Sequence, residues 1–526
     1  MGGGVFPVEM ERFYRDTTNV AQLGFGVNPC IFFLDDESSR YYVLLIPSRR
    51  SPMKTEIVPS PFQLAIYEDI ASGTGHTAVN AVAGSGKTTT LVNGMSHVPA
   101  GCSILFTAFN KRIIQELQSR KMRGVEVRGL HSYGVGAVNT GLGRFPLNEF
   151  RVEDMARKLH VDLDRSADLR KEVADCVSMA KAKLANDAEA VNAIIDEFGY
   201  TGAQNGSRDQ FVNHVLELLR QCMDTKDGCI DYDDMIWLPI VKNLRQRQFD
   251  RIFVDECQDL NLAQIELVLR AIKPGGRIVA VGDPRQGIYR FRGADDRAFE
   301  RITEKLNAKE LPLSVCYRCA SSIVRMAQEI EPKIQAAPNA EAGEVRWVSP
   351  EEMVAAVKGG DFVLSRTNAP LVSLCLGLLA DGRPAMIQGR EVGKQLTGLV
   401  KKQKATSVEE LRTSIEEWGK KECARLAAKR RDTQPVEDKT ACILAISEGA
   451  RSVQDVIERT ERLFAETSDF SRIVLSSTHR AKGLERDRVW LLADTYRRRP
   501  GVEEANIFYV AVTRARKTLV FVEGLS

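Results

Sequence analysis

The chain has 526 residues, of which 44% are hydrophobic and 27% are charged, proportions that are ordinary for a folded protein in water. The length is enough for three or four domains, and the net charge of +3 is small, so any polyanion-binding surface must be a local one. We find no apolar run of transmembrane length and no signal peptide, and therefore expect an intracellular protein without membrane contact.

Cysteine usage fits the same expectation. The eleven cysteines are scattered, and the one close pair, Cys316 and Cys319, has no second pair of Cys or His residues near it. A zinc site is therefore disfavoured, and reduced thiols are the simpler interpretation.

Residues 1–59 differ from the rest of the chain. Two short apolar runs, 31–34 and 41–46, flank an acidic turn and predict a β-hairpin. A connector rich in Pro and Ser follows at 47–61. We interpret 1–59 as an N-terminal accessory segment and a candidate binding site for a protein partner.

A phosphate-binding loop comes next along the chain. Residues 81–88 read AVAGSGKT, after a short apolar stretch and before a segment that predicts a helix start. Gly84 and Gly86 let the backbone turn so that successive N–H groups point at phosphate oxygens. Lys87 is placed to reach the β- and γ-phosphates, and the Thr88 hydroxyl to complete the shell of a magnesium ion. A Gly-Lys-Thr sequence also arises by chance, so this interpretation needs an acidic partner.

That partner follows a later predicted strand. The apolar run 252–254 delivers Asp255 and Glu256 to a strand end, with Gln258 and Asp259 at short offsets. Asp255 can hold magnesium through its water shell, and Glu256 can take a proton from an attacking water. The alternative is a solvated acidic turn, which the phosphate loop upstream disfavours. Together the two segments predict hydrolysis of a nucleoside triphosphate.

Apolar runs of strand length alternate with helical patterns from residue 60 onward. Between about 134 and 226, and again between about 394 and 469, the strand signal gives way to charged helical patterns. This organisation predicts an α/β protein with two doubly wound parallel sheets, each interrupted by a helical insertion. The predicted strands are 103–107, 251–254, 277–281, 361–365, 472–476, 488–492 and 518–522.

Further motifs occur in a fixed order, and their series resembles the UvrD/Rep-type branch of superfamily 1 helicases from about residue 61 to the C-terminus. The segments that carry the resemblance are 61–63, 107–111, 130–132, 282–294, 316–318, 477–485 and 509–515. Within that branch, 108–111, 365–369 and 509–515 resemble the core of the F-box DNA helicases, although no F-box is evident.

The resemblance implies two RecA-like lobes. The expected boundaries are 60–130 with 225–296 for the first lobe, 131–224 for its insertion, 297–393 with 470–526 for the second lobe, and 394–469 for a reduced second insertion.

The resemblance also implies ATP and Mg²⁺ as cofactors. Gln63 is expected to read the adenine edge, Tyr317 to stack on the base, and Glu485 to touch the ribose. Gln286 is expected to sense the γ-phosphate. The implied catalytic residues are Lys87, Glu256, Gln286, Arg318 and Arg514, the last two as arginine fingers. The implied nucleotide contacts are Gln63, Ala83, Gly84, Ser85, Gly86, Lys87, Thr88, Thr89, Tyr317 and Glu485, and the magnesium ligands are Thr88 and Asp255.

On the DNA side, Phe291 and Arg292 match an aromatic-plus-arginine pair that stacks bases and grips the strand in this family. A buried core position is the alternative for Phe291. The other DNA candidates are Asn110, His131, Tyr289 and His479, and for either histidine a structural role is the alternative.

The function implied is an ATP-dependent helicase that moves 3′→5′ on single-stranded DNA and unwinds forked or tailed duplex, in replication, repair or recombination. Its expected location is the cytoplasm or nucleoid, or the nucleus of a eukaryote. Two alternatives stay open: an RNA-directed motor of the same superfamily, and a protein-recruiting module whose ATPase is vestigial.

Basic clusters at 401–404, 429–431 and 497–499 are either solvated faces or nucleic-acid contacts. Because 429–431 falls in the second insertion, we expect Lys429, Arg430 and Arg431 to contact duplex phosphates near the fork.

Overall fold

The computed structural model divides the chain into two compact units, Met1–Pro59 and Ser60–Ser526. In the first unit it describes only three short strands, β1 (Phe6–Pro7), β2 (Cys30–Ile31) and β3 (Tyr42–Leu44), which form an antiparallel sheet of order β1-β3-β2. The pairing of β2 with β3 agrees with the predicted hairpin. The other described residues are 58–108, 111–119, 122, 124–159, 163, 166–200, 208–289, 293–295, 297–428, 432–465, 471–496 and 501–524.

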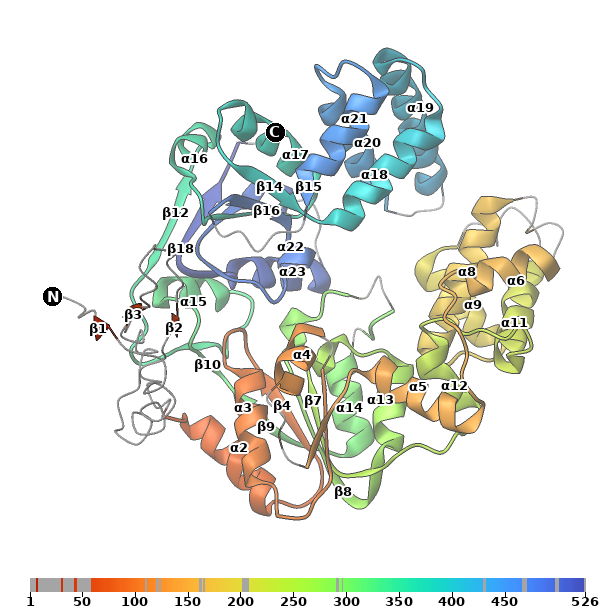
Figure 1. The fold of residues 1–526 in the computed structure, drawn as a ribbon, viewed down its shortest axis with the longest axis vertical. Helices are drawn as coiled ribbons and strands as arrows, with labels where there is room; N and C mark the ends of the chain where they lie inside the picture. Colours follow the sequence, from red (N-terminus) through yellow and green to blue (C-terminus); the bar gives the residue numbers. More distant parts are fainter. Residues whose placement is uncertain are drawn as a thin grey trace. The chain divides into compact units, whose positions relative to one another are not determined.

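The first lobe is built on a six-stranded parallel sheet of order β6-β5-β7-β8-β4-β9 (Figure 1). Its strands are β4 (Thr77–Ala81), β5 (Ile104–Ala108), β6 (Val125–Val127), β7 (Phe249–Asp255), β8 (Ile272–Gly282) and β9 (Lys309–Leu313). Alternate residues of the central strands enter opposite cores: Phe253 packs on one face of the sheet, and Ile252 and Val254 on the other. Helices cover both faces, which is why the buried stretches of these strands, such as Ile252–Val254 of β7 and Ile278–Val281 of β8, are apolar.

The helices of the first lobe are α2 (Pro61–Ser72), α3 (Lys87–Gly94), α4 (Lys111–Ser119), α5 (Leu130–Gly141), α12 (Asp234–Val241), α13 (Leu262–Arg270) and α14 (Ala298–Leu306). The start of α2 is set by its sequence, because Ser60 and Gln63 form a reciprocal capping box with Pro61 at the first helical position.

The first lobe extends further than expected. We predicted its end near residue 296, but β9 pairs with β4 in the register Thr77↔Lys309. Helix α14 supplies Phe299 and Ile302 to the core beneath the same sheet. The boundary therefore lies beyond Leu313, because β4 is the neighbour of β9 among the described strands.

The second lobe holds a seven-stranded parallel sheet of order β12-β18-β17-β13-β16-β14-β15. Its strands are β12 (Glu344–Val348), β13 (Phe362–Ser365), β14 (Ala385–Gln388), β15 (Phe464–Ala465), β16 (Ile473–Ser477), β17 (Arg486–Leu492) and β18 (Ala515–Val522). Its helices are α15 (Ser321–Ala327), α16 (Pro350–Ala356), α17 (Ala369–Ala380), α22 (Thr478–Ala481) and α23 (Val502–Val512). A short parallel pair, β10 (Val315–Cys316) and β11 (Gln335–Ala336), lies between the two large sheets in the chain order. The predicted α/β class with two parallel sheets is confirmed.

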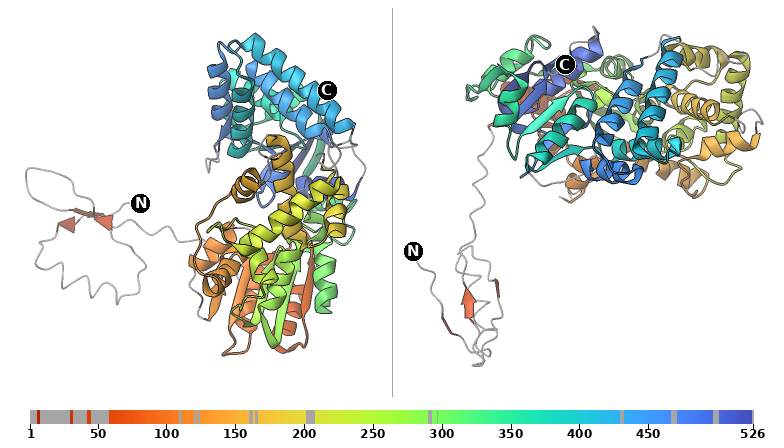
Figure 2. Two further views of the ribbon diagram at one scale, coloured as in Figure 1. Left: turned by 90° about the vertical axis from the view of Figure 1, so that its right-hand side faces the viewer. Right: turned by 90° about the horizontal axis from the view of Figure 1, so that it is seen from above.

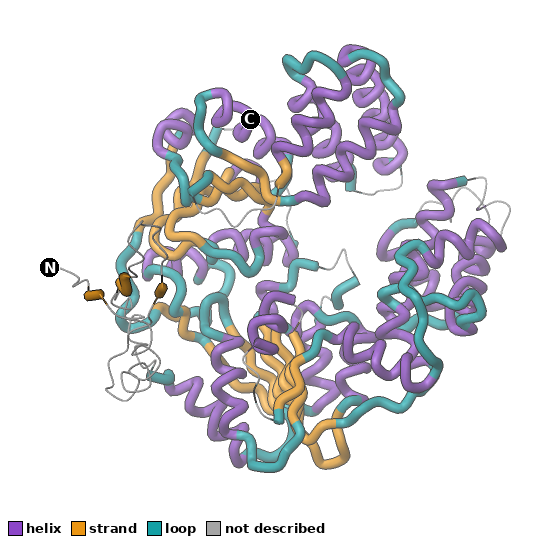
Figure 3. Tube along the Cα trace, viewed as in Figure 1, coloured by secondary structure: helices purple, strands orange, loops and turns teal. Residues whose placement is uncertain are grey.

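Both helical insertions are present (Figure 3). The first contains α6 (Arg151–Leu159), α8 (Ala167–Lys183), α9 (Ala188–Phe198) and α11 (Arg208–Asp224) around a core of its own. Buried charges tie this core to α12, because Arg151 and Lys181 both pair with Asp234. Each of these three side chains is almost fully buried, so the pairing compensates their desolvation.

The second insertion contains α18 (Arg390–Gln403), α19 (Val408–Ala427), α20 (Gln434–Ser447) and α21 (Val453–Leu463). It shares the core of its lobe: Leu411 and Ile443 belong to the same apolar cluster as Val363 and Ile387 of the second sheet. Figure 1 shows α18, α20 and α21 beside β15, the strand at one edge of the second sheet. The insertion therefore packs as part of its lobe. None of the described helices is both long and apolar enough to cross a membrane.

Candidate nucleotide-binding site

The phosphate loop joins the end of β4 to the start of α3. Gly84 and Gly86 have φ values of 68° and 80°, in the left-handed region that glycine adopts without strain. A Cβ atom on Gly84 would also lie 2.6 Å from the Cβ of Arg318, which belongs to the second lobe. Glycine at position 84 therefore serves two needs: it permits the turn, and it lets the second lobe approach the loop.

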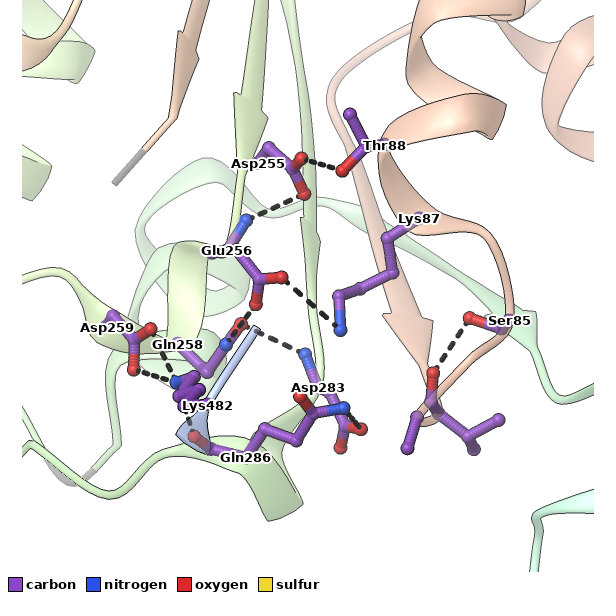
Figure 4. Close-up of polar contacts among 12 residues, drawn as sticks. Ser85, Lys87, Thr88, Asp255, Glu256, Gln258, Asp259, Asp283, Gln286 and Lys482 are labelled. Carbon is purple, nitrogen blue, oxygen red and sulfur yellow. Dashed lines mark hydrogen bonds and ion pairs between the residues drawn. The ribbon is translucent and has the colours of Figure 1, made fainter. Parts of the chain in front are cut away.

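The acidic residues at the end of β7 face this loop (Figure 4). The Thr88 hydroxyl donates to the Asp255 carboxylate, and the Lys87 ammonium lies 3.6 Å from Glu256 Oε1. Burial and the neighbouring Glu256 carboxylate raise the pKa of Asp255. Burial alone would raise the pKa of Glu256 as well, but the Lys87 and Lys482 ammonium groups lower it. Glu256 is therefore the ionised member of the pair.

Thr88 and Asp255 fit a magnesium ion. Their oxygens are adjacent, and Asp255 is fully buried at the carboxyl end of a parallel strand, where a cation would stabilise its charge. Among the described residues no group of three or more His, Cys, Asp or Glu side chains could hold a metal by itself. Such a protein cage is not needed for magnesium, which usually keeps several waters and binds substrate phosphates.

A chain of hydrogen bonds links Glu256 to Gln286. The Gln258 amide donates to Glu256 Oε2 at 2.6 Å, and its oxygen accepts from the Asp283 backbone N–H at 3.0 Å. The Asp283 carboxylate in turn accepts from the Gln286 amide at 2.7 Å. We did not assign Gln258 or Asp283 a role from the sequence, although both stand inside the quoted motifs. This series of hydrogen bonds fixes the orientations of the Glu256 and Gln286 side chains together.

Lys482 is the main site residue to which the sequence motifs assigned no role. It comes from the second lobe, and its ammonium donates to both Asp259 oxygens, at 2.6 and 2.8 Å, and to the Gln286 carbonyl at 2.6 Å. The same ammonium lies 4.8 Å from the centre of the Tyr289 ring. Lys482 thus joins the two lobes beside the phosphate loop. The sequence offered one indication of a role for Lys482, namely its position within the segment 477–485. A single lysine in a sequence does not show which buried carboxylate it will pair with.

The two expected arginine fingers lie on the second-lobe side. Arg514 is only 1% exposed, and its guanidinium donates to the Val510 and Leu484 carbonyls at 2.8 and 3.2 Å. Burial and the nearby Arg318 lower the pKa of Arg514 to about 10, which still leaves it charged at neutral pH. Arg318 forms an ion pair with Glu485 and donates to the Thr513 carbonyl at 3.3 Å.

These groups surround one cavity of 460 Å³. It combines the phosphate loop and the acidic strand end of the first lobe with three cationic side chains of the second. The lining residues are Gly84, Ser85, Gly86, Lys87, Thr88, Thr89, Glu256, Asp259, Gln286, Tyr289, Arg318, Lys482, Gly483 and Arg514.

The residues expected to contact the base and the ribose lie outside the lining of this cavity. Tyr317 is 46% exposed and does not line the cavity, although its backbone N–H donates to the Gly84 carbonyl at 2.9 Å. Glu485 lies close by, paired with Arg318. Gln63 does not line the cavity: its amide oxygen accepts from the Ser60 N–H, and its amide nitrogen donates to Thr90. Adenine recognition by Gln63 would require these two contacts to break. Ala83 lies behind the loop, where its N–H donates to the Tyr509 hydroxyl.

Only part of the expected DNA surface is described. Asn110, Phe291 and Arg292 lie outside the described residues, as do Lys429, Arg430 and Arg431. Tyr289 was predicted as a DNA contact. In the structure it lines the cavity beside the phosphate loop, and its hydroxyl donates to the His479 carbonyl at 3.2 Å. The structure therefore places Tyr289 and His479 together where the lobes meet.

His131 lies at the start of α5, exposed and edge-on to the Tyr232 ring, with 6.3 Å between ring centres. Tyr232 is itself 48% exposed, and three aspartates flank it in the sequence 231–234. Tyr232 was not predicted as a site residue, because an aromatic residue within an acidic turn carries no periodic signal.

Two family models match this chain: the UvrD/REP helicase N-terminal domain over residues 65–307 and the UvrD-like helicase C-terminal domain over residues 472–522. The chain belongs to the UvrD/Rep-like helicases. The matched ranges contain the phosphate loop, the acidic strand end and Arg514, so family membership and site geometry rest on the same residues.

Relatives within the family are distant. The chain is 28% identical over 295 residues to the ATP-dependent DNA helicase PcrA of Bacillus subtilis, covering 50% of this chain and 38% of PcrA. It is 26% identical over 288 residues to the ATP-dependent DNA helicase Rep of Escherichia coli, covering 48% and 41%. It is 25% identical over 508 residues to F-box DNA helicase protein 1 of Schizosaccharomyces pombe, covering 84% and 55%. The matches thus span between about two fifths and about half of each relative's length.

Proposed function

We propose that this chain is an ATP-driven motor that moves 3′→5′ along single-stranded DNA and unwinds forked or tailed duplex. The observation that carries the proposal is the single cavity in which Lys87 and Glu256 of one lobe face Arg318 and Arg514 of the other. A site assembled from two lobes can couple nucleotide turnover to their relative movement. The direction of movement rests on family membership.

ATP would bind with its phosphates in the loop, where backbone N–H groups and the Lys87 ammonium meet them. Thr88 and Asp255 would hold magnesium, which neutralises charge on the phosphate oxygens when bound. The exposed Tyr317 ring would stack on the base. Lys87 would exchange its contact with Glu256 for the phosphates, leaving that carboxylate available.

Hydrolysis would then use groups already oriented by the protein. The Glu256 carboxylate accepts the proton of the attacking water, while Gln286, held through Asp283 and Gln258, orients that water or the γ-phosphate. Arg318 and Arg514 stabilise the charge that develops on the transferring phosphoryl group. Because both arginines come from the second lobe, catalysis requires the cleft to be closed.

The motor needs a strand to move, and DNA is the substrate that the names of the relatives specify. His131 and Tyr232 offer an exposed aromatic pair on which bases can stack without regard to sequence. Tyr289 and His479 link such a strand path to the nucleotide cavity. Phe291 and Arg292 stay predicted contacts. A DNA substrate would place the protein in the compartment that holds DNA.

The decisive experiment compares partial duplexes with a 3′ tail, a 5′ tail and a fork, alongside ATPase measurements with single-stranded DNA or RNA. We expect unwinding of the 3′-tailed and forked substrates and stimulation by DNA. Lys87→Ala should reduce stimulated ATPase by about a hundredfold or more while strand binding persists. Normal turnover in that variant would refute the site assignment.

The outcomes also separate the alternatives. Stimulation by RNA far above DNA would favour the RNA-directed motor. Absence of hydrolysis with saturating single-stranded DNA would favour a recruiting module, and unwinding from a 5′ tail alone would reverse the proposed polarity.

A further inference from the structure

Two cysteines flank Tyr317 and Arg318 where the second lobe meets the phosphate loop. Cys316 ends β10, and Cys319 lies just before α15. Both side chains are buried, and their thiols are within hydrogen-bonding reach of each other. The short loop between them carries the exposed ring and the arginine finger of the proposed nucleotide site.

The pair contacts both halves of that site. Cys319 Sγ lies 3.8 Å from the Thr513 carbonyl, which also accepts from Arg318 at 3.3 Å. Cys316 Sγ lies 2.9 Å from the position that a Cβ on Gly84 would occupy. A small molecule that enters the cavity lined by Gly84 is therefore separated from Cys316 by little more than a glycine. These contacts place one sulfur atom beside the carbonyl that holds Arg318 and the other beside the loop.

The environment of Cys316 differs from that of the other buried thiols. The hydrogen bond from Cys319, with the neighbouring backbone N–H groups and Arg318, lowers the pKa of Cys316 to about 6. Burial instead raises the pKa of Cys176, Cys222 and Cys375. Since the thiolate is the reactive form, Cys316 is chemically distinguished among them.

We propose that Cys316 and Cys319 are a redox modification site: a peroxide oxidises them to a reversible disulfide that switches off the nucleotide site. The switch-off rests on the proposed ATPase function. Paired cysteines of this kind in intracellular proteins are typically transient and regulatory. Neither a metal nor a further protein residue is needed for the reaction.

The chemistry balances with hydrogen peroxide as the oxidant. The Cys316 thiolate attacks one peroxide oxygen, the O–O bond breaks, and the departing hydroxide takes up the proton lost by the thiol, giving a sulfenic acid and one water. The Cys319 sulfur then attacks the sulfenic sulfur, and the S–O bond breaks. The second hydroxide leaves as water with the Cys319 proton. Two thiols become one disulfide, and one peroxide becomes two waters.

The disulfide would change the geometry of the arginine finger. An S–S bond is about 2.05 Å long, far shorter than the reach of a thiol–thiol hydrogen bond, so the two sulfur atoms must approach each other. The ring closed by the bond contains the backbone of Tyr317 and Arg318, so Arg318 is drawn from Thr513 and Glu485. A misplacement of about 1 Å at a catalytic group can cost about a hundredfold in rate.

The test treats the reduced full-length chain with hydrogen peroxide and then with dithiothreitol. Three readouts are taken together: DNA-stimulated ATPase, binding of a fluorescent ATP analogue, and the mass of the proteolytic peptide that spans 316–319. We expect this peptide to lose two hydrogen atoms as ATPase falls at least about tenfold, and dithiothreitol to restore both. Cys319→Ser should retain ATPase and resist peroxide, because it keeps a hydrogen-bond donor at the Thr513 carbonyl. Cys316→Ser serves as a second resistant variant if Cys319→Ser does not fold.

The matched control is Cys423→Ser, a partly exposed cysteine in α19 that should remain as sensitive to peroxide as the parent chain. An unchanged peptide mass after oxidation would overturn the proposal, as would a disulfide that leaves both ATPase and analogue binding unaltered. Equal inactivation of the serine variants would overturn it too. Absence of ATPase in the reduced chain would instead refute the proposed function, while the peptide mass and the analogue binding would still decide the redox site.

Discussion

Lys482 shows at the scale of single residues how the second lobe completes the first. Its ammonium holds Asp259 and the Gln286 carbonyl, so it joins the acidic segment to the residue expected to sense the γ-phosphate. Burial raises the pKa of Asp259 to about 6 despite the opposing effect of Lys482. Replacing the lysine would therefore leave the buried Asp259 carboxylate without the cation that now neutralises it.

We therefore predict that Lys482→Ala lowers DNA-stimulated ATPase by roughly 10- to 100-fold, because one of the contacts that join the lobes at the cavity is lost and Arg318 and Arg514 are positioned less accurately. Steady-state kinetics at saturating DNA provides the measurement. Lys517→Ala, an exposed lysine of the same lobe, is the control and should behave like the parent chain. Equal activity of the two variants would rule out a role for Lys482 at the site.

The hydrogen-bonded chain from Glu256 to Gln286 leads to a second prediction. Gln258→Leu removes the donor to Glu256 and the acceptor of the Asp283 N–H, while leaving the phosphate loop intact. The expected result is a fall in kcat of about tenfold or more with little change in KM for ATP, since only groups used in hydrolysis lose their orientation. A rise in KM with unchanged kcat would show instead that Gln258 serves nucleotide binding.

At the scale of elements, Asp69 joins α2 to three strands of the first sheet. Its carboxylate accepts from Thr77 at 2.5 Å and pairs with Arg277 at 2.9 Å and Lys309 at 3.2 Å, which lie on β4, β8 and β9. Burial would raise the pKa of Asp69, but these three partners lower it below its usual value. The carboxylate is thus a structural anchor between the helix and the sheet.

Asp69→Asn should lower the free energy of unfolding by about 3 kcal/mol at neutral pH, because it leaves the buried Arg277 without its counter-ion. Because the pKa of Asp69 is lower in the folded chain than in the unfolded chain, the ionised carboxylate stabilises the fold. This stabilisation is complete above the unfolded-state pKa and is lost as the pH falls through the folded-state pKa. The difference between parent and variant should therefore shrink below about pH 4. Denaturant unfolding across this pH range tests it, with Asp224→Asn, at an exposed ion pair, as control. A difference that stays constant with pH would contradict the electrostatic explanation.

The groove beside α18 offers a described alternative to the basic cluster at 429–431. Arg390, Lys394 and Lys401 line it together with Thr397, along one side of the helix. Helix α18 follows directly from β14 at the carboxyl edge of the sheet, and Gly389 at its start lies against Arg480, the neighbour of His479. This basic side could continue a strand path from the lobe interface.

Replacing Lys394 and Lys401 with Ala should weaken binding of forked DNA and reduce the slope of log affinity against log salt by roughly one unit for each phosphate that the protein no longer neutralises. ATPase at saturating single-stranded DNA should persist, because neither lysine lines the nucleotide cavity. The matched control is Lys402→Ala, which removes a charge from the same helix outside the groove. An unchanged affinity and slope would identify this side of α18 as a solvated face.

The elements that sequence patterns predicted are the ones buried on both sides. Central strands such as β7 and β13 contain short buried apolar runs, Ile252–Val254 and Phe362–Leu364, and were found with boundaries within a few residues. Edge strands were missed: β9 contains Pro312 and exposed charged residues, and every position of β12 is exposed or partly exposed. The short interior strand β14 was missed as well. An edge strand needs only one sheet neighbour and can tolerate such residues, so its sequence carries a weak signal.

The site divides in the same way. The turn of the loop at Gly84 and Gly86 and the acidic strand end that faces it could be predicted, because short local motifs set their backbone geometry. Lys482, Tyr232 and the engaged amide of Gln63 could not, because their roles depend on which residues other segments bring to them. Contacts between segments far apart in the chain are fixed by packing, which no local pattern records.

At the scale of the whole second unit, the two helical insertions meet. Arg425 of α19 lies 3.5 Å from Glu172 of α8, and Figure 2 shows the two groups of helices next to each other. The first insertion has its own core, whereas the second shares the core of its lobe. A change in the angle between the lobes would therefore alter the contact between Arg425 and Glu172. A DNA strand running between the insertions would be enclosed for as long as this contact is formed.

Arg425→Glu should open that contact, because it places a carboxylate beside Glu172 and Glu422 in place of their shared cation. We expect ATPase activity at saturating DNA to stay near that of the parent chain, since no residue of either insertion lines the cavity beside the phosphate loop. Unwinding should become less processive, because the strand escapes more readily, so long duplexes yield proportionally less product than short ones in single-turnover assays. Adding Glu172→Arg should restore part of the processivity, since opposite charges then face each other again. Equal impairment on short and long duplexes would show that the contact serves stability of the fold rather than retention of the strand.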